Sequence, residues 1–262
     1  MTPAPTLIFV HGAWHSPECL VHVLAALQQQ GLRCLAPQLE FCGTEQPVES
    51  LAGSVHQVQD LIAAETSAGR NVLLINHSFG GCVGCSAVDG FTEKNPARLT
   101  PTSGKILGIV QVCAFMPPSK TALYDVLHDA FDMTKSFHHA HDDGWEWIDA
   151  AEPEDLFYND LSPEQAQYWK SRLLKQSTSA MKDRDPIYAG WADCPVWYLL
   201  CTRDHAIPIS AQEAMVAAAR EAGASVTTKV VDAGHSPFLS KPDETVAFIA
   251  EAVEHFRGKS TL

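Results

Sequence analysis

The sequence predicts an α/β fold, with a mostly parallel sheet of about six strands, helices on both faces and an inserted helical cap. Short, almost continuously apolar runs alternate with longer amphipathic runs, as is typical of strands buried on both faces of a parallel sheet. The alternation breaks once, between residues 116 and 193, and then resumes. We therefore expect a core of residues 1–115 and 194–262, interrupted by a helical cap over residues 116–193.

The expected elements follow one another as strand and helix, which favours right-handed crossovers between parallel strands. The expected strands are Thr6–Val10, Arg33–Ala36, Asn71–Asn76, Ile106–Phe115, Val196–Thr202 and Ser225–Val231. The expected core helices are Pro17–Gln30, Ser54–Ala68, Gly80–Glu93, Ser210–Ala222 and Asp243–Phe256. Within the cap we expect helices over Ala122–Ala130 and Pro163–Gln176, among many aromatic residues.

The composition indicates the size of the core and the kinds of partner to expect. The chain has 262 residues, of which 46% are hydrophobic, enough for one substantial core. A formal charge of −13 disfavours nucleic acid as a partner. No apolar run approaches the ~20 residues that span a bilayer, and the N-terminus lacks the basic region of a signal peptide. We expect a cytoplasmic protein without membrane partners that acts on a small molecule, and a homodimer is the assembly left open.

The chain has eight cysteines, and several lie in predicted strands or helices, where free cysteine behaves as a small hydrophobic residue. Reduced thiols fit this pattern better than a disulfide framework. The pair Cys82-x-x-Cys85 falls inside a predicted helix and has no second pair that could complete a zinc site. We expect both thiols to be structural.

The run "LLINHSFGG" (73–81) places Ser78 between a buried strand and a helix that opens with two glycines. This is the context in which a tight turn presents a nucleophilic serine. Gly80 and Gly81 would let the helix approach the strand closely. Serine needs a base, a group that orients the base and donors for the oxyanion.

The remaining parts of such a site follow in the chain. His235, in "VVDAGHSPF", lies after the last predicted strand and is the candidate base. Asp204, in "LLCTRDHAIP", lies after the preceding strand and is the preferred orienting group, with Asp232 as its competitor. The backbone amides of Ala13 and Phe79 are the candidate oxyanion donors.

Four stretches carry a resemblance to a known family: "LIFVHGAWHSPE", "NHSFGG", "CTRDHAIP" and "DAGHSPFLSKPDE". Over nearly its full length the chain resembles the α/β-hydrolase superfamily, and within it the small capped group of esterases and hydroxynitrile lyases. The resemblance implies Ser78 as nucleophile, His235 as general base and Asp204 as its orienting group. It also implies Ala13 and Phe79 as oxyanion donors.

Three positions differ from patterns of that group. Asn76 stands where a small residue is preferred, and we interpret the turn as a variant: asparagine tolerates unusual backbone angles, and its side-chain amide could hydrogen-bond within the turn. Gly12 and Ser236 stand where the related lyases carry threonine and lysine. Both differences favour acyl chemistry over cyanohydrin cleavage.

We therefore expect a serine hydrolase that cleaves a carboxylic ester, lactone or thioester of a mostly apolar substrate through an acyl-enzyme, without a cofactor. Two alternatives stay open: acyl transfer to a hydroxyl of the substrate itself, as in polyketide release, and a ligand-binding receptor on the same fold. Residues that could line the pocket are His11, Trp14, His77, Trp145 and Trp191.

A metal site is the other hypothesis that the sequence raises. The tract "FHHAHDD" gathers His138, His139, His141, Asp142 and Asp143, all of which can ligate zinc. The tract lacks a spacing that would fix ligand geometry, so we expect a solvated loop and no metal.

Overall fold

The computed structural model describes residues 3–130, 139–148 and 152–259. Within these ranges, six parallel strands form the main sheet in the order β2-β1-β3-β4-β8-β9. This confirms the predicted fold class. The strands are β1 (Thr6–Val10), β2 (Cys34–Leu35), β3 (Val72–His77), β4 (Ile106–Val112), β8 (Val196–Cys201) and β9 (Val226–Val231).

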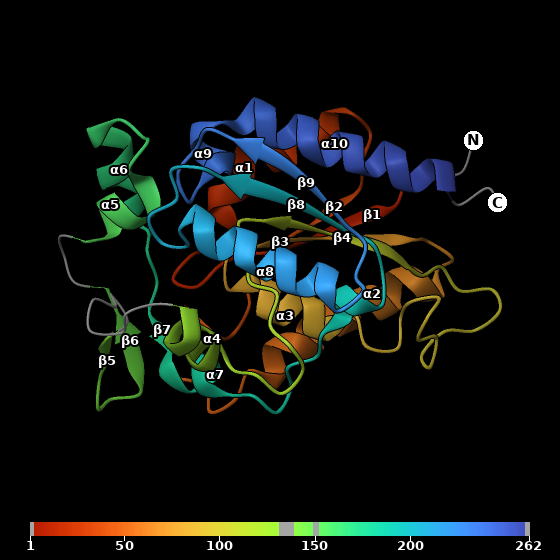
Figure 1. The fold of residues 1–262 in the computed structure, drawn as a ribbon, viewed down its shortest axis with the longest axis horizontal. Coiled ribbons are helices and arrows are strands. Elements are labelled where there is room, and N and C mark those ends of the chain that lie inside the picture. Colours follow the sequence, from red (N-terminus) through yellow and green to blue (C-terminus); the bar gives the residue numbers. More distant parts are fainter. Residues whose placement is uncertain (1–2, 131–138, 149–151, 260–262) are drawn as a thin grey trace.

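Helices cover both faces of this sheet (Figure 1). Alternate residues of β1 divide between the two faces: Leu7 and Phe9 pack with α1 and α10, whereas Ile8 and Val10 pack with α2, α3 and α8. This alternation gives two apolar layers, one on each side of the sheet. The helices are α1 (Val21–Gln29), α2 (Ala52–Ser67), α3 (Gly80–Ala87), α8 (Ile209–Glu221), α9 (Pro237–Ser240) and α10 (Pro242–Lys259), with short 3₁₀ helices at Pro17–Leu20 and Gly190–Ala192.

Residues 116–193 separate β4 from β8. They contain the helices α4 (Leu123–Ala130), α5 (Glu152–Tyr158), α6 (Pro163–Lys170) and α7 (Thr178–Lys182). They also contain a small antiparallel sheet of β5 (His139–Ala140), β6 (Trp145–Trp147) and β7 (Gln176–Ser177), which the sequence analysis did not anticipate. Figure 1 shows α5 and α6 beside the carboxyl ends of the core strands.

Several boundaries differ from the predicted ones. The strand predicted over Arg33–Ala36 is only two residues long, at the edge of the sheet. The helix predicted over Gly80–Glu93 ends at Ala87, and the one predicted over Pro163–Gln176 ends at Lys170 because Gln176 pairs with β6. No helix in the described ranges is both long and apolar enough to cross a bilayer.

Candidate active site

Ser78 lies in a strained turn between β3 and α3. Its φ of 52° is in the left-handed region, which a residue with a side chain adopts at a cost of about 1–3 kcal/mol. The turn is held through the Ser78 carbonyl, which accepts hydrogen bonds from the amides of Gly81 (3.0 Å) and Phe115 (3.1 Å). The serine is therefore presented by the backbone, as its sequence context predicts.

The two glycines after Ser78 are required by close packing. A Cβ added to Gly80 would lie 2.3 Å from the carbonyl oxygen of Val10, and one added to Gly81 would lie 2.1 Å from that of Phe115. Any side chain here would push α3 away from β1 and from the chain after β4. The close approach keeps the start of α3 directly behind the serine.

Asn76 is accommodated by Gly84 rather than by an unusual backbone. It is a regular β3 residue, paired with Val10 and Gln111, and it is completely buried. A Cβ on Gly84 would lie 2.0 Å from the Asn76 Oδ1, so the glycine one turn into α3 leaves space for the amide. The expected local hydrogen bond is not found, because neither amide atom has a hydrogen-bond partner among the described residues.

His235 connects Ser78 to Asp204. Its Nε2 lies 3.0 Å from the Ser78 Oγ, and its Nδ1 lies 2.8 Å from the Asp204 Oδ2. A carboxylate can only accept, so Nδ1 carries the proton and Nε2 accepts from the serine hydroxyl. His235 is 1% exposed and Ser78 is 9% exposed. The three side chains thus form a buried chain of hydrogen bonds that leads away from the serine oxygen.

The carboxylate of Asp204 is fixed by its own loop and by α8. Its Oδ1 accepts from the amides of Ala206 (2.8 Å) and Ile207 (2.7 Å), and its Oδ2 also accepts from Gln212 Nε2 (3.2 Å). Asp232, the competing candidate, instead contacts Thr202 and Arg203, and its side chain is 75% exposed. The structure therefore brings Asp204, and not Asp232, to the imidazole.

Two backbone amides beside the serine are free. Neither the Ala13 nor the Phe79 amide donates a hydrogen bond in the described part of the chain. Gly12 packs directly on the serine, since a Cβ there would lie 2.9 Å from the Ser78 Cβ. Phe79 directly precedes α3, where the helix dipole favours negative charge. These donors are suited to an oxygen that becomes negative at a carbon attached to Ser78.

Two predicted pocket residues, His11 and His77, are held by backbone contacts. The His11 ring donates from Nδ1 to the Gly12 carbonyl (2.9 Å) and accepts the Leu39 amide at Nε2 (3.1 Å). Burial lowers the pKa of His11 to about 4. Burial likewise holds the pKa of His77 well below its usual value. Both rings are therefore neutral near pH 7 and stabilise the main chain around the site.

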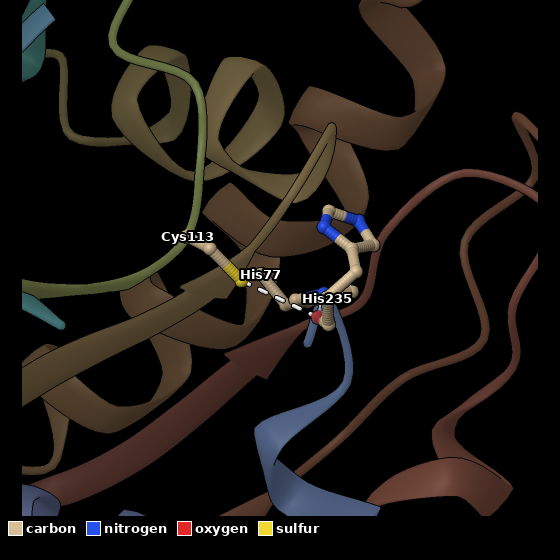
Figure 2. Close-up of side chains that lie close together, drawn as sticks. All are labelled: His77, Cys113 and His235. Carbon is tan, nitrogen blue, oxygen red and sulfur yellow. Dashed lines mark hydrogen bonds between the residues drawn. The ribbon is translucent and has the colours of Figure 1, made fainter. Parts of the chain in front are cut away.

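His77 and Cys113 both donate to the carbonyl oxygen of His235 (Figure 2). The distances are 2.9 Å from His77 Nε2 and 3.3 Å from the Cys113 Sγ. Ligand atoms of the three residues lie close enough to surround a metal ion. Both ring nitrogens of His235 are already bonded to Ser78 and Asp204, so an ion there would compete with these contacts. Cys113, which the sequence analysis did not select, acts as a support for the His235 loop.

The three tryptophans predicted to line the pocket contact different parts of the structure. Trp14 lies between Ala13 and His15 in the loop after β1, which we call the oxyanion loop, and its Nε1 donates to the Glu146 carbonyl (3.2 Å). Trp145 is buried in β6, where Lys175 lies over its ring. Trp191 lines an apolar cavity of about 620 Å³ together with Phe115.

Within the histidine and aspartate tract, His139 begins β5, and the turn between β5 and β6 follows at residues 141–144. His138 lies outside the described residues. His141, Asp142 and Asp143 are exposed, and the Asp143 carboxylate accepts the Trp145 amide (3.1 Å). This contact fits the predicted loop.

Comparisons with known proteins show the family to which the chain belongs. The model of the alpha/beta hydrolase family matches residues 7–248. The alpha/beta hydrolase nvfD of Aspergillus novofumigatus is 26% identical over 255 residues, covering 95% of this chain and 96% of the relative. Methylesterase 7 of Arabidopsis thaliana is 24% identical, covering 95% and 96%.

Solved structures show the same fold. A pyrethroid hydrolase from Sphingobium faniae JZ-2 superposes with a TM-score of 0.77 at 19% identity, over 96% of this chain and 98% of its own. Polyneuridine aldehyde esterase superposes with a TM-score of 0.76 at 18% identity, over 95% and 100%. Since the family model spans most of the sequence, the chain belongs to the alpha/beta hydrolase family.

Proposed function

We propose that this protein is a serine hydrolase that cleaves a carboxylic ester, lactone or thioester through an acyl-enzyme. The observation that carries the proposal is the continuous hydrogen-bonded chain from the Ser78 Oγ through His235 to Asp204. A hydroxyl next to a neutral imidazole can lose its proton as it attacks, and a buried carboxylate stabilises the imidazolium that forms.

The reaction would begin with attack of the Ser78 Oγ on the substrate carbonyl carbon, while His235 Nε2 takes the hydroxyl proton. The Ala13 and Phe79 amides would bind the oxyanion of the tetrahedral intermediate. Collapse of the intermediate expels the alcohol or thiol, which receives the proton from His235, and leaves an ester on Ser78. Water then attacks that ester, again with His235 as base, and the acid is released.

Names of relatives support ester chemistry. Methylesterase 7 of Arabidopsis thaliana matches this chain over nearly its full length. The carbendazim hydrolyzing esterase of Nocardioides sp. is 30% identical over 125 residues, which cover 47% of this chain. Ester hydrolysis is the activity that these names share, and it is also the simplest reaction for the site described above.

The apolar cavity lined by Phe115 and Trp191 supports an apolar acyl or alcohol portion. Phe115, which lines this cavity, donates its amide to the Ser78 carbonyl, so one lining residue adjoins the serine turn, although neither Ser78 nor His235 is in the lining. Residues 116–193 would act as a cap, because this segment supplies the opposite wall through Val126 and Trp191. We assign the cavity to the apolar part of the substrate.

A bulky substitution on α8 tests that assignment. Ala217 and Ala218 are both exposed, but only Ala218 lines the cavity, so Ala218→Trp is compared with Ala217→Trp. With p-nitrophenyl esters, the ratio of kcat/KM for octanoate to that for acetate should fall about tenfold in Ala218→Trp only. An unchanged ratio in both variants would place the apolar portion elsewhere.

Labelling with a fluorophosphonate probe tests the nucleophile. The probe should add to Ser78, identified by peptide mapping, and Ser78→Ala should abolish labelling and lower ester turnover by several orders of magnitude. Turnover that persists in Ser78→Ala would end the proposal. Product analysis by mass spectrometry separates hydrolysis, which gives a free acid, from transfer to a substrate hydroxyl, which gives a cyclic ester.

A further inference from the structure

The end of α5 and the residues after it contact three separate loops of the candidate site. The Tyr158 hydroxyl donates to His15 Nε2 (2.9 Å), and Asn159 Nδ2 donates to the Arg203 carbonyl (2.8 Å). The Asp160 Oδ2 accepts the Gly234 amide (2.7 Å). The three partners belong to the oxyanion loop, the Asp204 loop and the His235 loop. Three consecutive residues, 158–160, therefore join all parts of the site except the serine turn itself.

The Tyr158 contact reaches the oxyanion loop through His15. The His15 Nδ1 donates to the Ala13 carbonyl (2.7 Å), which leaves Nε2 free to accept from the tyrosine hydroxyl. Burial lowers the pKa of His15 to about 3, so the ring is neutral and keeps this arrangement near pH 7. Tyr158 thus holds the main chain at Ala13, whose amide is a candidate oxyanion donor.

The Asp160 contact reaches His235 through the preceding residue. A Cβ on Gly234 would lie 2.2 Å from the Asn159 Oδ1 and 2.8 Å from the Asp160 Oδ1. Gly234 is not among the residues with positive φ, so its backbone would accept alanine. The glycine is therefore needed for the close approach of residues 159 and 160, and not for its conformation.

Phe157 covers the imidazole. Its ring centroid lies 5.5 Å from that of His235 and 5.2 Å from that of His15. With Phe157 in place, the base is almost completely buried. Ser78 is itself only 9% exposed, so the nucleophile, like the base, lies in a nearly closed site next to this segment.

We propose that residues 157–160 form a closing segment, which opens to admit substrate and orders the His235 and oxyanion loops when it docks. Within it, Asp160 and Tyr158 are positioning residues: Asp160 acts on His235 through Gly234, and Tyr158 acts on Ala13 through His15. The inference rests on the proposed serine hydrolase activity, since it concerns the geometry of that reaction.

Substitutions that remove single docking contacts test the proposal. Asp160→Ala and Tyr158→Phe each delete one hydrogen bond, and Gly234→Ala blocks the approach sterically. Each should lower kcat for a p-nitrophenyl ester, and the rate of fluorophosphonate labelling at Ser78, by about tenfold or more, with KM changed much less. Asp160→Asn keeps an acceptor oxygen and should recover most of the loss.

Gly258→Ala is the control for the steric variant Gly234→Ala. Gly258→Ala adds a Cβ that meets nothing within 4 Å and should match the wild type. Circular dichroism checks that each variant folds, and where Gly234→Ala does not, Tyr158→Phe and Asp160→Ala carry the test. Folded variants that label and turn over at the wild-type rate would overturn the closing segment. A wild-type protein that does not label at all would instead overturn the proposed function.

Discussion

The Nε2 of His235 lies 3.0 Å from the Oγ of Ser78, although 157 residues separate them in the chain. The contact exists because β3 and β9 are parallel strands of one sheet, so that the residues that follow them emerge at the same edge. Asp204, which follows β8, emerges there too. The carboxyl edge of a parallel sheet is where α/β proteins bind ligands.

Replacing Asp204 by asparagine should lower kcat roughly 10³–10⁴-fold. The amide would no longer stabilise an imidazolium, and it would favour the wrong tautomer of His235. Asp232→Asn is the matched control, and it should stay near wild-type turnover because that side chain is exposed and bonded to Thr202 and Arg203. Steady-state kinetics of both variants with one ester measures the difference in kcat. A larger loss in the Asp232 variant would reverse the assignment.

Gly84→Ala should destabilise the wild-type protein but stabilise an Asn76→Ala variant. In the wild type the new methyl group would collide with the Asn76 amide, which is the nearest neighbour of that position, and cost about 1–3 kcal/mol. In an Asn76→Ala background the collision disappears, and alanine should gain up to about 1 kcal/mol over glycine within a helix. Urea unfolding of the four proteins gives the coupling energy. Additive effects would show that Gly84 does not make room for Asn76.

The free energy of unfolding should decrease as the pH falls from about 6.5 towards 4. Burial lowers the pKa of His11 to about 4 and that of His15 to about 3. Each takes up a proton on unfolding between its folded pKa and the unfolded value of 6.5, so acid favours the unfolded state. One such histidine contributes at most about 1.4 kcal/mol per pH unit.

Urea unfolding at pH 7, 6 and 5 measures this slope. His15→Gln keeps a donor and an acceptor but cannot titrate, so its slope should be smaller than that of the wild type by about one proton. Stability that is constant across this range would contradict the buried neutral histidines. Below pH 4.5 a further loss is expected, since bonding to Arg70 and Arg33 lowers the pKa of Glu65 to about 2.

At pH 8 a thiol reagent should modify the folded protein at no more than one site. Seven of the eight cysteines are buried, and all eight are free thiols. Burial raises the pKa of Cys42 and Cys85 to about 12, so these remain protonated and unreactive. Titration with Ellman's reagent should find eight thiols after unfolding. In the folded protein only Cys34, which is not fully buried, should react, and Cys34→Ser should abolish that reaction. Rapid modification of Cys82 and Cys85 would instead favour a redox pair.

Local patterns in the sequence predicted much of the fold. The apolar runs predicted β1, β3, β4 and β8 because a strand buried on both faces must be apolar throughout, whereas the edge strands β2 and β9 are only partly buried. The small sheet between β4 and β8 was not predicted, since its strands have only two or three residues and carry no periodicity of their own. The residues of α5 that contact the site were likewise not predicted, because the sequence does not show which of the many aromatic residues between β4 and β8 reach the site.

The sequence by itself determined the fold class and named Ser78, His235 and Asp204, since a serine between a strand and a helix, and polar residues after apolar strands, can be recognised locally. The tertiary structure alone decided between Asp204 and Asp232, explained Asn76 through Gly84, and placed residues 157–160 across three loops. The reason is physical: these contacts join residues that are distant in the chain, and their distances are set only when the helices pack on the sheet.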